Sequence, residues 1–403
     1  MSRPYYTDSY TMLFDAIIAT LEEVDGRPAA ILESSYFYPT SGGQPYDTGR
    51  LQSGDEIARV VDVVERESDG AVLHVFDRPL APGRVAAAID RDRRMDHMRH
   101  HTGQHILSQA FVRVAEAVTV GFHLSPQSVT IDLDRADLSA AEIDRAEALA
   151  NEIIWADRPV SVRVVTHAEA ATLPLRKTPP GRDGQLRLID IEGFDLTACG
   201  GTHVARTGEV GLVKIARTER RGNTTRVEFL CGERALADYR QRQAILRDLG
   251  AVLTTGAAEL PAAGAKLQDE LKAARAELKQ REAALLALEA EGLLAAAEPL
   301  DDVRLVARVF ADRQPDELRR LTTALTEAGG VVALLALAGD RSHLIFGRSA
   351  DAPGMMGELI KPALAALGGR GGGSPTLAQG GGPAADEATL ARVLAAAALS
   401  LRE

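Results

Sequence analysis

The chain has 403 residues, of which 45% are hydrophobic and 26% are charged, a composition typical of a folded globular protein rather than a disordered one. It contains no run of 18 or more apolar residues, so we expect no membrane-spanning helix. The formal net charge of −11 argues against a protein that binds nucleic acid through overall positive charge.

The cysteine count and the N-terminal sequence bear on the compartment. Only two cysteines occur, and the first residues, MSRPYYTDSYTM, lack the apolar core of a secretory signal. We therefore expect a reducing, cytoplasmic setting without a disulfide framework.

Residues 1–95 are expected to form a β-rich, barrel-like domain. Short apolar runs such as AAILESSYFYP and ARVVDVVERE are separated by Gly, Pro and Asp. Between these runs lies the loop YPTSGGQPYDTG, in which Gly42 and Gly43 permit a close backbone approach to a ligand. The plain alternative is an ordinary hairpin loop.

Residues 96–235 are expected to form an α+β core that opens on the stretch RHHTGQHILSQAF at 99–111. Its apolar residues recur at helical spacing, which predicts a helix. On a helix, His101 and His105 lie on one face, one turn apart, and two imidazoles so placed can bind one metal ion. Solvated histidines at a polar helix end are the alternative.

A second half-site follows about a hundred residues later, in TACGGTHVART. Cys199 and His203 are four residues apart, and the glycine pair between them predicts a tight turn. A thiolate and imidazoles suit Zn²⁺, so His101, His105, Cys199 and His203 would complete a tetrahedral shell around one ion. Alternatively, one ligand is looser and leaves room for water or substrate. Taken alone, Cys199 reads as a small buried residue and His203 as a strand residue.

Two local clusters of positive charge flank these half-sites. They are RDRRMDHMRHH at 91–101, which contains Arg93 and Arg94, and KIARTERRGNTTR at 214–226, which contains Arg220 and Arg221. Their position beside the half-sites favours contacts with a phosphate backbone over a merely solvated surface.

Residues 236–295 are expected to be helical, with a heptad seam that is interrupted by Arg281. The seam predicts a coiled-coil arm that spaces domains or dimerises the chain, against the alternative of a single helix packed on a neighbour. Its members are Leu267, Leu271, Ala274, Leu278, Leu285 and Leu288.

Residues 296–403 are expected to form a compact α/β domain. Within it, GGRGGGSPTLAQGGG at 368–382 predicts a flexible backbone with little side-chain bulk. Its N–H groups, at Gly371, Gly372 and Gly373 above all, are candidates for binding phosphate or sugar. A disordered surface loop is the alternative.

Three motifs together resemble one family. They are FYPTSGGQPYDTG at 37–49, HTGQH at 101–105 and CGGTHV at 199–204. The chain resembles the editing domain of alanyl-tRNA synthetase, and in particular the freestanding trans-editing proteins called AlaX in their long form. The glycine run resembles the DHHA1-type domain that ends those synthetases. The first 95 residues show no ATP-binding signature of a class II synthetase, so we expect an editor without a charging site.

The resemblance implies an α+β fold and a hydrolase. An N-terminal barrel-like domain would precede a zinc-dependent editing core, a coiled-coil linker and a DHHA1-like domain that binds tRNA or dimerises the chain. The implied reaction is hydrolysis of the aminoacyl ester of mischarged tRNA(Ala), chiefly Ser-tRNA(Ala), with Gly-tRNA(Ala) as a second substrate. The partners implied are this tRNA and a second copy of the chain, without a membrane.

The resemblance also assigns residues. The zinc ligands would be the four residues named above, and Thr40 is our candidate for sensing the serine hydroxyl. The same pocket would be lined by Ser41, Gln44 and Phe122. As catalytic groups we expect Gln104, which lies inside the HxxxH motif, and the backbone amides of Gly42 and Gly43 as oxyanion donors.

Two other functions are compatible with the same ligands. A zinc hydrolase acting on another small substrate is disfavoured, because Thr102 follows His101 where the H-E-x-x-H motif has glutamate. A structural-zinc RNA-binding protein without hydrolase activity would have all four ligand positions saturated by protein.

Overall fold

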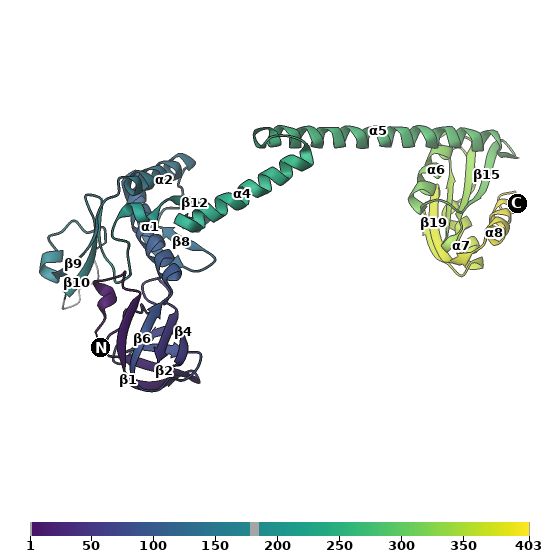
Figure 1. Ribbon diagram of the computed structural model, residues 1–403. Helices are drawn as coiled ribbons and strands as arrows, with labels where there is room; N and C mark the ends of the chain where they lie inside the picture. The colour runs from purple at the N-terminus through teal and green to yellow at the C-terminus, as the bar shows by residue number, and fades with distance from the viewer. Residues whose placement is uncertain (1, 178–184, 403) are drawn as a thin grey trace. The chain divides into compact units, whose positions relative to one another are not determined.

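The computed structural model describes residues 2–177 and 185–402 (Figure 1). The chain forms two compact units, Met1–Leu249 and Gly250–Glu403. In the described part of the chain, no helix is both long and apolar enough to cross a membrane.

Unit 1 begins with a short 3₁₀ helix, η1 (Pro4–Tyr6), followed by a closed antiparallel barrel of six strands in the order β1-β2-β5-β4-β3-β6. Alternating apolar side chains such as Leu32, Leu51 and Val60 fill its interior, as the two-residue period of a strand requires. The barrel confirms the predicted β-rich start of the chain. Its strands are β1 (Leu13–Val24), β2 (Arg27–Leu32), β3 (Gly49–Ser53), β4 (Glu56–Glu65), β5 (Val72–Phe76) and β6 (Gly83–Ile89).

Helix α1 (Arg91–Ala115) leads from the barrel into the second part of unit 1 (Figure 1). The Asp90 side chain caps it by accepting a hydrogen bond from the Arg93 backbone N–H. A Cβ atom at Gly103 would lie 2.5 Å from Cys231 Sγ, so the helix lies directly against β13. This close packing fixes the helix face that carries the two histidines.

The remaining described elements of unit 1 form two sheets, the helices α2, α3 and α4, and the 3₁₀ helix η2. The four-stranded sheet has the order β12-β13-β8-β7, and the three-stranded sheet has the order β11-β10-β9. Helix α4 (Gly232–Leu253) follows β13 directly. The other bounds are β7 (Thr119–Leu124), β8 (Val129–Leu133), α2 (Ala140–Trp155), β9 (Val160–Thr166), α3 (His167–Ala170), β10 (Gln185–Ile191), β11 (Asp195–Ala198), η2 (Thr207–Val210), β12 (Val213–Arg221) and β13 (Thr224–Cys231).

A buried ion pair joins the start of α1 to the loop after β2. The Arg94 Nε atom lies 3.1 Å from both carboxylate oxygens of Asp47, and both side chains are fully buried. Arg94 also donates to the Ser9 carbonyl at 2.8 Å and to the Tyr36 carbonyl. The prediction that Arg94 contacts a phosphate backbone is therefore wrong, because its guanidinium is enclosed and its donors are used inside the protein.

We expect Asp47→Ala to lower the free energy of unfolding of unit 1 by about 3–5 kcal/mol, because the substitution leaves the Arg94 charge buried and unpaired. Urea unfolding followed by circular dichroism measures this change. The matched control is Asp15→Ala, which breaks the exposed pair between Asp15 and Arg84 and should cost less than about 1 kcal/mol. Equal losses in the two variants would contradict the role given to Asp47.

Unit 2 is a three-layer α/β domain preceded by a long helix. Its six-stranded sheet has the order β14-β15-β16-β17-β19-β18, in which only the β15–β16 pair is parallel. The bounds are η3 (Ala257–Glu259), α5 (Leu260–Ala295), β14 (Glu298–Leu300), β15 (Val303–Phe310), α6 (Pro315–Glu327), β16 (Val331–Leu337), β17 (Gly339–Arg348), α7 (Met356–Ala366), β18 (Arg370–Gly373), β19 (Leu377–Ala385) and α8 (Glu387–Leu399).

Strand β16 shows how this sheet is buried on both faces. Val332 and Leu334 pack with the core that includes α7 and α8, whereas Val331 and Ala333 pack with the core that includes α6. Figure 1 shows α6 on one side of the sheet and α8 on the other. A continuous apolar strand of this kind is expected where helices cover both faces.

The glycine-rich stretch is not the flexible segment that its composition predicts. It forms the paired strands β18 and β19, in which Gly371 lies opposite Gly380. A Cβ atom at Gly380 would lie 2.8 Å from the Arg370 carbonyl oxygen, so glycine is required for the two strands to pair this closely. A Cβ atom at Gly357 of α7 would lie 2.7 Å from the Gly373 carbonyl oxygen, so the helix also packs directly on β18. Contacts of Gly371, Gly372 and Gly373 with nucleic acid stay a prediction.

Helix α5 keeps its predicted leucine seam uncovered. Leu271 and Leu285 are 50% and 68% exposed, and the rest of the seam is similarly open. The C-terminal part of α5 packs on α6 through Leu286 and Ala290, but the seam faces away from this contact. An apolar stripe of this length is unusual on an exposed helix face. The coiled coil stays a prediction.

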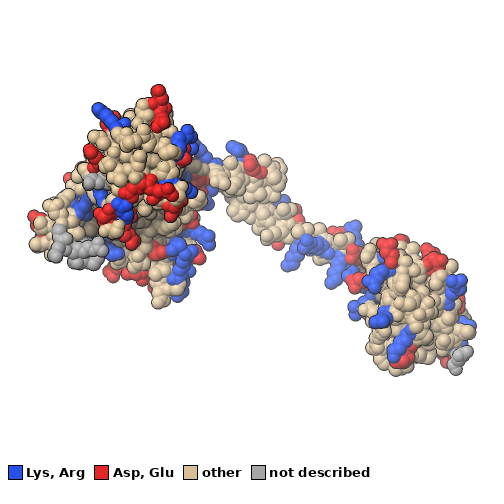
Figure 2. Space-filling view, turned by 90° about the horizontal axis from the view of Figure 1, so that it is seen from below, with Lys and Arg blue, Asp and Glu red and all other residues tan. Residues whose placement is uncertain are grey.

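Charged side chains are mixed over the surface. On the face shown in Figure 2, basic and acidic groups alternate over each unit, in agreement with the net charge of −11. Attraction to a polyanion would therefore depend on local groups rather than on the field of the whole chain.

Candidate metal centre

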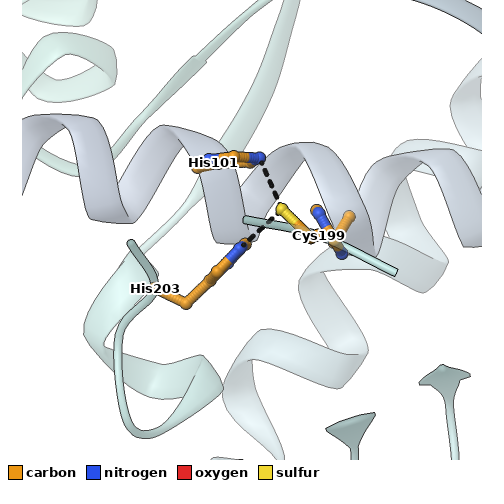
Figure 3. A group of neighbouring side chains, drawn as sticks. His101, Cys199 and His203 are labelled. Carbon is orange, nitrogen blue, oxygen red and sulfur yellow. Dashed lines mark hydrogen bonds between the residues drawn. The ribbon is translucent and has the colours of Figure 1, made fainter. Parts of the chain in front are cut away.

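Four side chains from two distant parts of the sequence converge in unit 1. His101 and His105 extend from α1, and Cys199 and His203 come from the loop after β11. One ligand atom from each residue lies within 4.8 Å of the other three. Figure 3 shows Cys199 Sγ between two imidazoles, 3.3 Å from His101 Nε2 and 3.3 Å from His203 Nε2.

These distances fit one tetrahedral ion. In a zinc site with Zn–S near 2.3 Å and Zn–N near 2.0–2.1 Å, the sulfur and nitrogen ligands lie about 3.5 Å apart. The observed 3.3 Å between Cys199 Sγ and each imidazole nitrogen is close to this value. A set of one thiolate and three imidazoles suits zinc better than Mg²⁺ or Ca²⁺, which prefer oxygen ligands.

The outer nitrogen of each histidine faces an acceptor that fixes the ring. His101 Nδ1 donates to Gln44 Oε1 at 2.8 Å, and the same oxygen accepts the Thr202 backbone N–H at 3.1 Å. A backbone N–H can only donate, so this atom is the amide oxygen and His101 carries its proton on Nδ1. The Nε2 lone pair is thereby turned toward the centre.

The other two histidines also face outer groups, His203 through a hydrogen bond and His105 through an ion-pair contact without hydrogen-bond geometry. His203 Nδ1 lies 3.1 Å from Thr102 Oγ1, and His105 Nδ1 lies 3.4 Å from Asp195 Oδ2. Asp195 is itself held by Arg176, whose Nε donates to Oδ1 at 2.7 Å. Three histidines with three outer partners are what a metal centre needs to keep its ligands oriented.

The electrostatics favour the metal-binding forms of Cys199 and His203, but in the absence of an ion they favour the protonated form of His105. Burial by itself raises the pKa of the Cys199 thiol, but neighbouring His101 and His203 outweigh burial and hold that pKa well below its usual value. Burial and the charge of His101 lower the pKa of His203 well below its usual value. Burial also acts to lower the pKa of His105, but Asp195 and Cys199 outweigh it and raise that pKa. A thiolate beside a neutral His203 is the state that coordinates zinc.

Two glycines permit close approaches around the centre. A Cβ atom at Gly201 would lie 2.2 Å from His101 Cε1, so the turn between Cys199 and His203 can pass the imidazole only without a side chain. A Cβ atom at Gly43, where φ is 85°, would lie 2.7 Å from the Phe122 carbonyl oxygen. The TSGGQ loop is thereby brought against β7.

The residues predicted to form the amino-acid pocket are brought near the metal centre in part. The Phe122 ring lies 5.2 Å from the His101 ring, and the Gly43 carbonyl accepts the Leu124 N–H at 3.1 Å. Ser41 and Gln44 pair through two backbone hydrogen bonds that close the turn of the loop. Thr40 is exposed, and its hydroxyl oxygen accepts the Tyr46 N–H at 3.1 Å.

The other predicted residues lie in different surroundings. Gln104 is buried, and its amide donates to Ser108 Oγ at 2.7 Å, one turn further along α1. Arg93 donates to the Tyr46 carbonyl at 2.9 Å, close to the TSGGQ loop. Arg220 and Arg221 are exposed at the end of β12.

Sequence reasoning missed three groups behind the ligands. Thr102 lies inside the HxxxH motif, and Asp195 lies four residues before Cys199, at the start of β11. These positions could have been suspected, because histidine ligands need outer acceptors. No motif or spacing in the sequence around Arg176 predicts that it contacts Asp195.

Comparisons with known proteins cover the part of the chain that holds this centre. The domain described as "Threonyl and Alanyl tRNA synthetase second additional domain" matches residues 186–228, which include Cys199 and His203. The chain is 29% identical to the alanyl-tRNA editing protein AlaX-L of Pyrococcus horikoshii, over 94% of each chain. It is 34% identical to an alanine–tRNA ligase of Methanoregula boonei, over 96% of this chain and 42% of that ligase.

The chain therefore spans about two fifths of the length of the ligases it matches. Among solved structures, the C-Ala domain of alanyl-tRNA synthetase from Aquifex aeolicus matches 27% of this chain and 98% of the domain, at 31% identity and a TM-score of 0.24. The sequence similarities confirm the resemblance predicted from the three motifs.

Proposed function

Because this chain resembles the freestanding alanyl-tRNA editing proteins over nearly its whole length, we propose that it hydrolyses the aminoacyl ester of mischarged tRNA(Ala). The favoured substrate is Ser-tRNA(Ala), with Gly-tRNA(Ala) as the second. The observation that carries the proposal is the convergence of His101, His105, Cys199 and His203 beside the TSGGQ loop.

The four ligands would hold one zinc ion, which when bound fixes the groups that position the substrate. Because protein fills all four positions, the ion would polarise the ester carbonyl only where the substrate enters as an added ligand. Around it, Gln44, Thr102 and Asp195 keep the imidazoles oriented. The backbone N–H groups of Gly42 and Gly43 have no hydrogen-bond partner among the residues described, which leaves them available to a developing oxyanion. An aminoacyl ester is already labile, so the positioning of ester and water is a large part of what is required.

Release of serine from Ser-tRNA(Ala), measured with zinc-loaded protein and after treatment with a chelator, tests the proposal. We expect hydrolysis by the loaded protein, loss after chelation, and recovery on addition of zinc, with Ala-tRNA(Ala) largely spared. Tight tRNA binding without hydrolysis by fully loaded protein would instead support a structural-zinc RNA-binding protein. Hydrolysis of small esters or amides without hydrolysis of Ser-tRNA(Ala) would support a zinc hydrolase of another class.

Selectivity for serine is assigned to Thr40. We expect Thr40→Val to lower kcat/KM for Ser-tRNA(Ala) by roughly 10- to 100-fold with little change in tRNA affinity, because the serine hydroxyl loses its partner. The Tyr46 N–H also loses its acceptor in this variant, so Thr40→Ser, which keeps a hydroxyl at the position, is the control. Equal loss of hydrolysis and tRNA affinity in Thr40→Val would contradict the assignment.

The exposed seam of α5 supports a homodimer. We propose that the seams of two copies pack together, since leucines at heptad spacing stabilise helices in pairs. Leu278→Glu is expected to shift a dimer to monomer in sedimentation velocity, whereas Gln280→Glu, on another face of α5, is not. A monomeric wild-type chain at micromolar concentration would contradict this proposal.

A further inference from the structure

A cavity of unit 1 lies next to the metal centre, and the Cys199 loop forms one of its walls. It has a volume of about 580 Å³, within the range of small-molecule sites. Its walls come from η1, β9, β10 and the Cys199 loop, and its lining includes Tyr6, Thr7, Val164, Leu186, Arg187 and Cys199. Since Cys199 is at once a wall of this cavity and a metal ligand, a molecule bound here is adjacent to the centre.

Arg187 is the charged group of this cavity, and no carboxylate among the described residues pairs with it. The acid that faces it is Cys199, whose thiolate charge would be taken up by a bound zinc ion. Its Nε donates to the Tyr6 carbonyl at 2.7 Å, and its Nη1 donates to the Cys199 carbonyl at 2.5 Å. Nη2 is buried and has no hydrogen-bond partner among the described residues, and no carboxylate in that part of the chain pairs with Arg187.

Three other arginines of unit 1 each pair with a carboxylate. Arg94 faces Asp47, Arg176 faces Asp195, and Arg234 faces Asp96. A guanidinium in a largely desolvated place normally requires such a carboxylate, because a neutral carbonyl accepts a hydrogen bond without neutralising the charge. Arg187 differs from these arginines because it lacks a carboxylate partner and keeps Nη2 unused, which leaves a donor for an anion from a ligand.

We infer that this cavity receives the terminal nucleotide of the tRNA, with the phosphate of that nucleotide held by Arg187. The inference rests on the proposed function, in which the ester on the terminal ribose must lie at the metal centre. A guanidinium is well matched to phosphate oxygens, and the phosphodiester is the anion nearest to that ribose. The apolar surfaces of Val164 and Leu186 are available to the base, and the Tyr6 ring, which lies 5.9 Å from the Arg187 guanidinium, lines the same cavity.

Arg187 would also be a positioning residue, because it ties the Cys199 carbonyl to the Tyr6 carbonyl. Phosphate bound to the same guanidinium would thus be rigidly placed relative to Cys199. The experiment must therefore separate phosphate recognition from support of the loop.

Binding of AMP and of adenosine to the zinc-loaded full chain, measured by isothermal titration calorimetry, provides this separation without requiring hydrolysis. We expect wild-type protein to bind AMP roughly 10- to 100-fold more tightly than adenosine, as a charge-assisted hydrogen bond to phosphate implies. In Arg187→Met the preference should fall to near one, with the zinc content unchanged. The matched control is Arg163→Met on the neighbouring strand β9, where Arg163 is partly exposed and pairs with Asp190, and this variant should keep the preference.

Hydrolysis then links the cavity to the reaction. We expect Arg187→Met to lower kcat/KM for Ser-tRNA(Ala) by roughly 10- to 100-fold while changing hydrolysis of seryl-adenosine, which lacks the phosphate, much less. Equal loss on both substrates with zinc retained would overturn the phosphate contact and leave only support of the loop.

Wild-type protein that binds AMP no better than adenosine would also overturn the inference, whatever the variants do. If Arg187→Met loses zinc, Arg187→Lys, which retains the charge, should keep part of the AMP preference, and its absence would count against the contact. Failure of the proposed function has a different signature, because wild-type protein would then hydrolyse neither ester even if it preferred AMP.

Discussion

A chain carrying Cys199→Ala is expected to lose its zinc and its hydrolysis of Ser-tRNA(Ala) together. Cys199 supplies the only sulfur ligand, and its Sγ lies 3.3 Å from both His101 Nε2 and His203 Nε2, so its removal opens the shell and leaves imidazoles without a shared anion. Loss of groups that only support metal ligands typically costs 10- to 100-fold, so we expect removal of a ligand to cost at least about 100-fold. Zinc per chain, by atomic emission, and the initial rate of serine release are the two measurements.

Cys231→Ala is the matched control, because it removes the other cysteine of the chain. Cys231 is 1% exposed, packs against α1 at Gly103 and is not one of the four ligands. Burial raises the pKa of its thiol well above the usual value, which agrees with an inert packing residue. This variant should keep zinc and activity while losing some stability. Retention of zinc by Cys199→Ala, or equal loss in both variants, would refute the assignment of the ligands.

The ligands could be predicted from sequence because their chemistry is local. His101 and His105 stand one helical turn apart in a stretch whose apolar spacing is helical, and α1 forms there. Cys199 and His203 flank two glycines that require a turn. Residue type and spacing within five residues were enough for each half-site, and the shared preference for zinc joined the halves.

The surroundings of the ligands could not be predicted, because they depend on contacts between distant segments. Gln44 was expected in the amino-acid pocket, but its amide bridges His101 and the Thr202 backbone. Arg94 was expected to contact a phosphate backbone because it lies in a cluster of positive charge. It is buried because Asp47, in the loop after β2, pairs with its guanidinium. Neither partner is within forty residues of the group it contacts.

The prediction of a flexible glycine-rich segment was wrong for a related reason. Composition rules treat glycine as a source of flexibility, because they consider only the backbone freedom of each residue. In β18, β19 and α7 the decisive quantities are distances between backbones, which leave no space for a Cβ atom at Gly380 of the hairpin or at Gly357 of α7. Close packing of a helix on a strand is a tertiary property, so the same residues that predict a loop in isolation form an edge of the sheet.

A chain that ends at Leu249 is expected to keep its metal centre and to lose most of its preference for full-length tRNA. The four ligands and their outer partners Gln44, Thr102 and Asp195 all belong to Met1–Leu249, which has its own barrel and core. If Gly250–Glu403 grips a second part of the tRNA, linkage of the two units raises the effective concentration of the charged end at the centre. Its removal should raise KM for Ser-tRNA(Ala) by roughly 100-fold and change kcat much less.

A short seryl-minihelix that contains only the acceptor stem separates this explanation from a folding defect. Such a substrate ends before any second grip, so the full chain and the shortened chain should hydrolyse it at similar rates, each with one zinc per chain. If the shortened chain loses zinc or fails on the minihelix, Gly250–Glu403 supports the fold of the catalytic unit instead of binding tRNA. If KM for full-length tRNA stays unchanged, unit 2 does not bind tRNA, as its mixed surface charge would suggest. Recognition of the tRNA would then lie in the groups around Cys199.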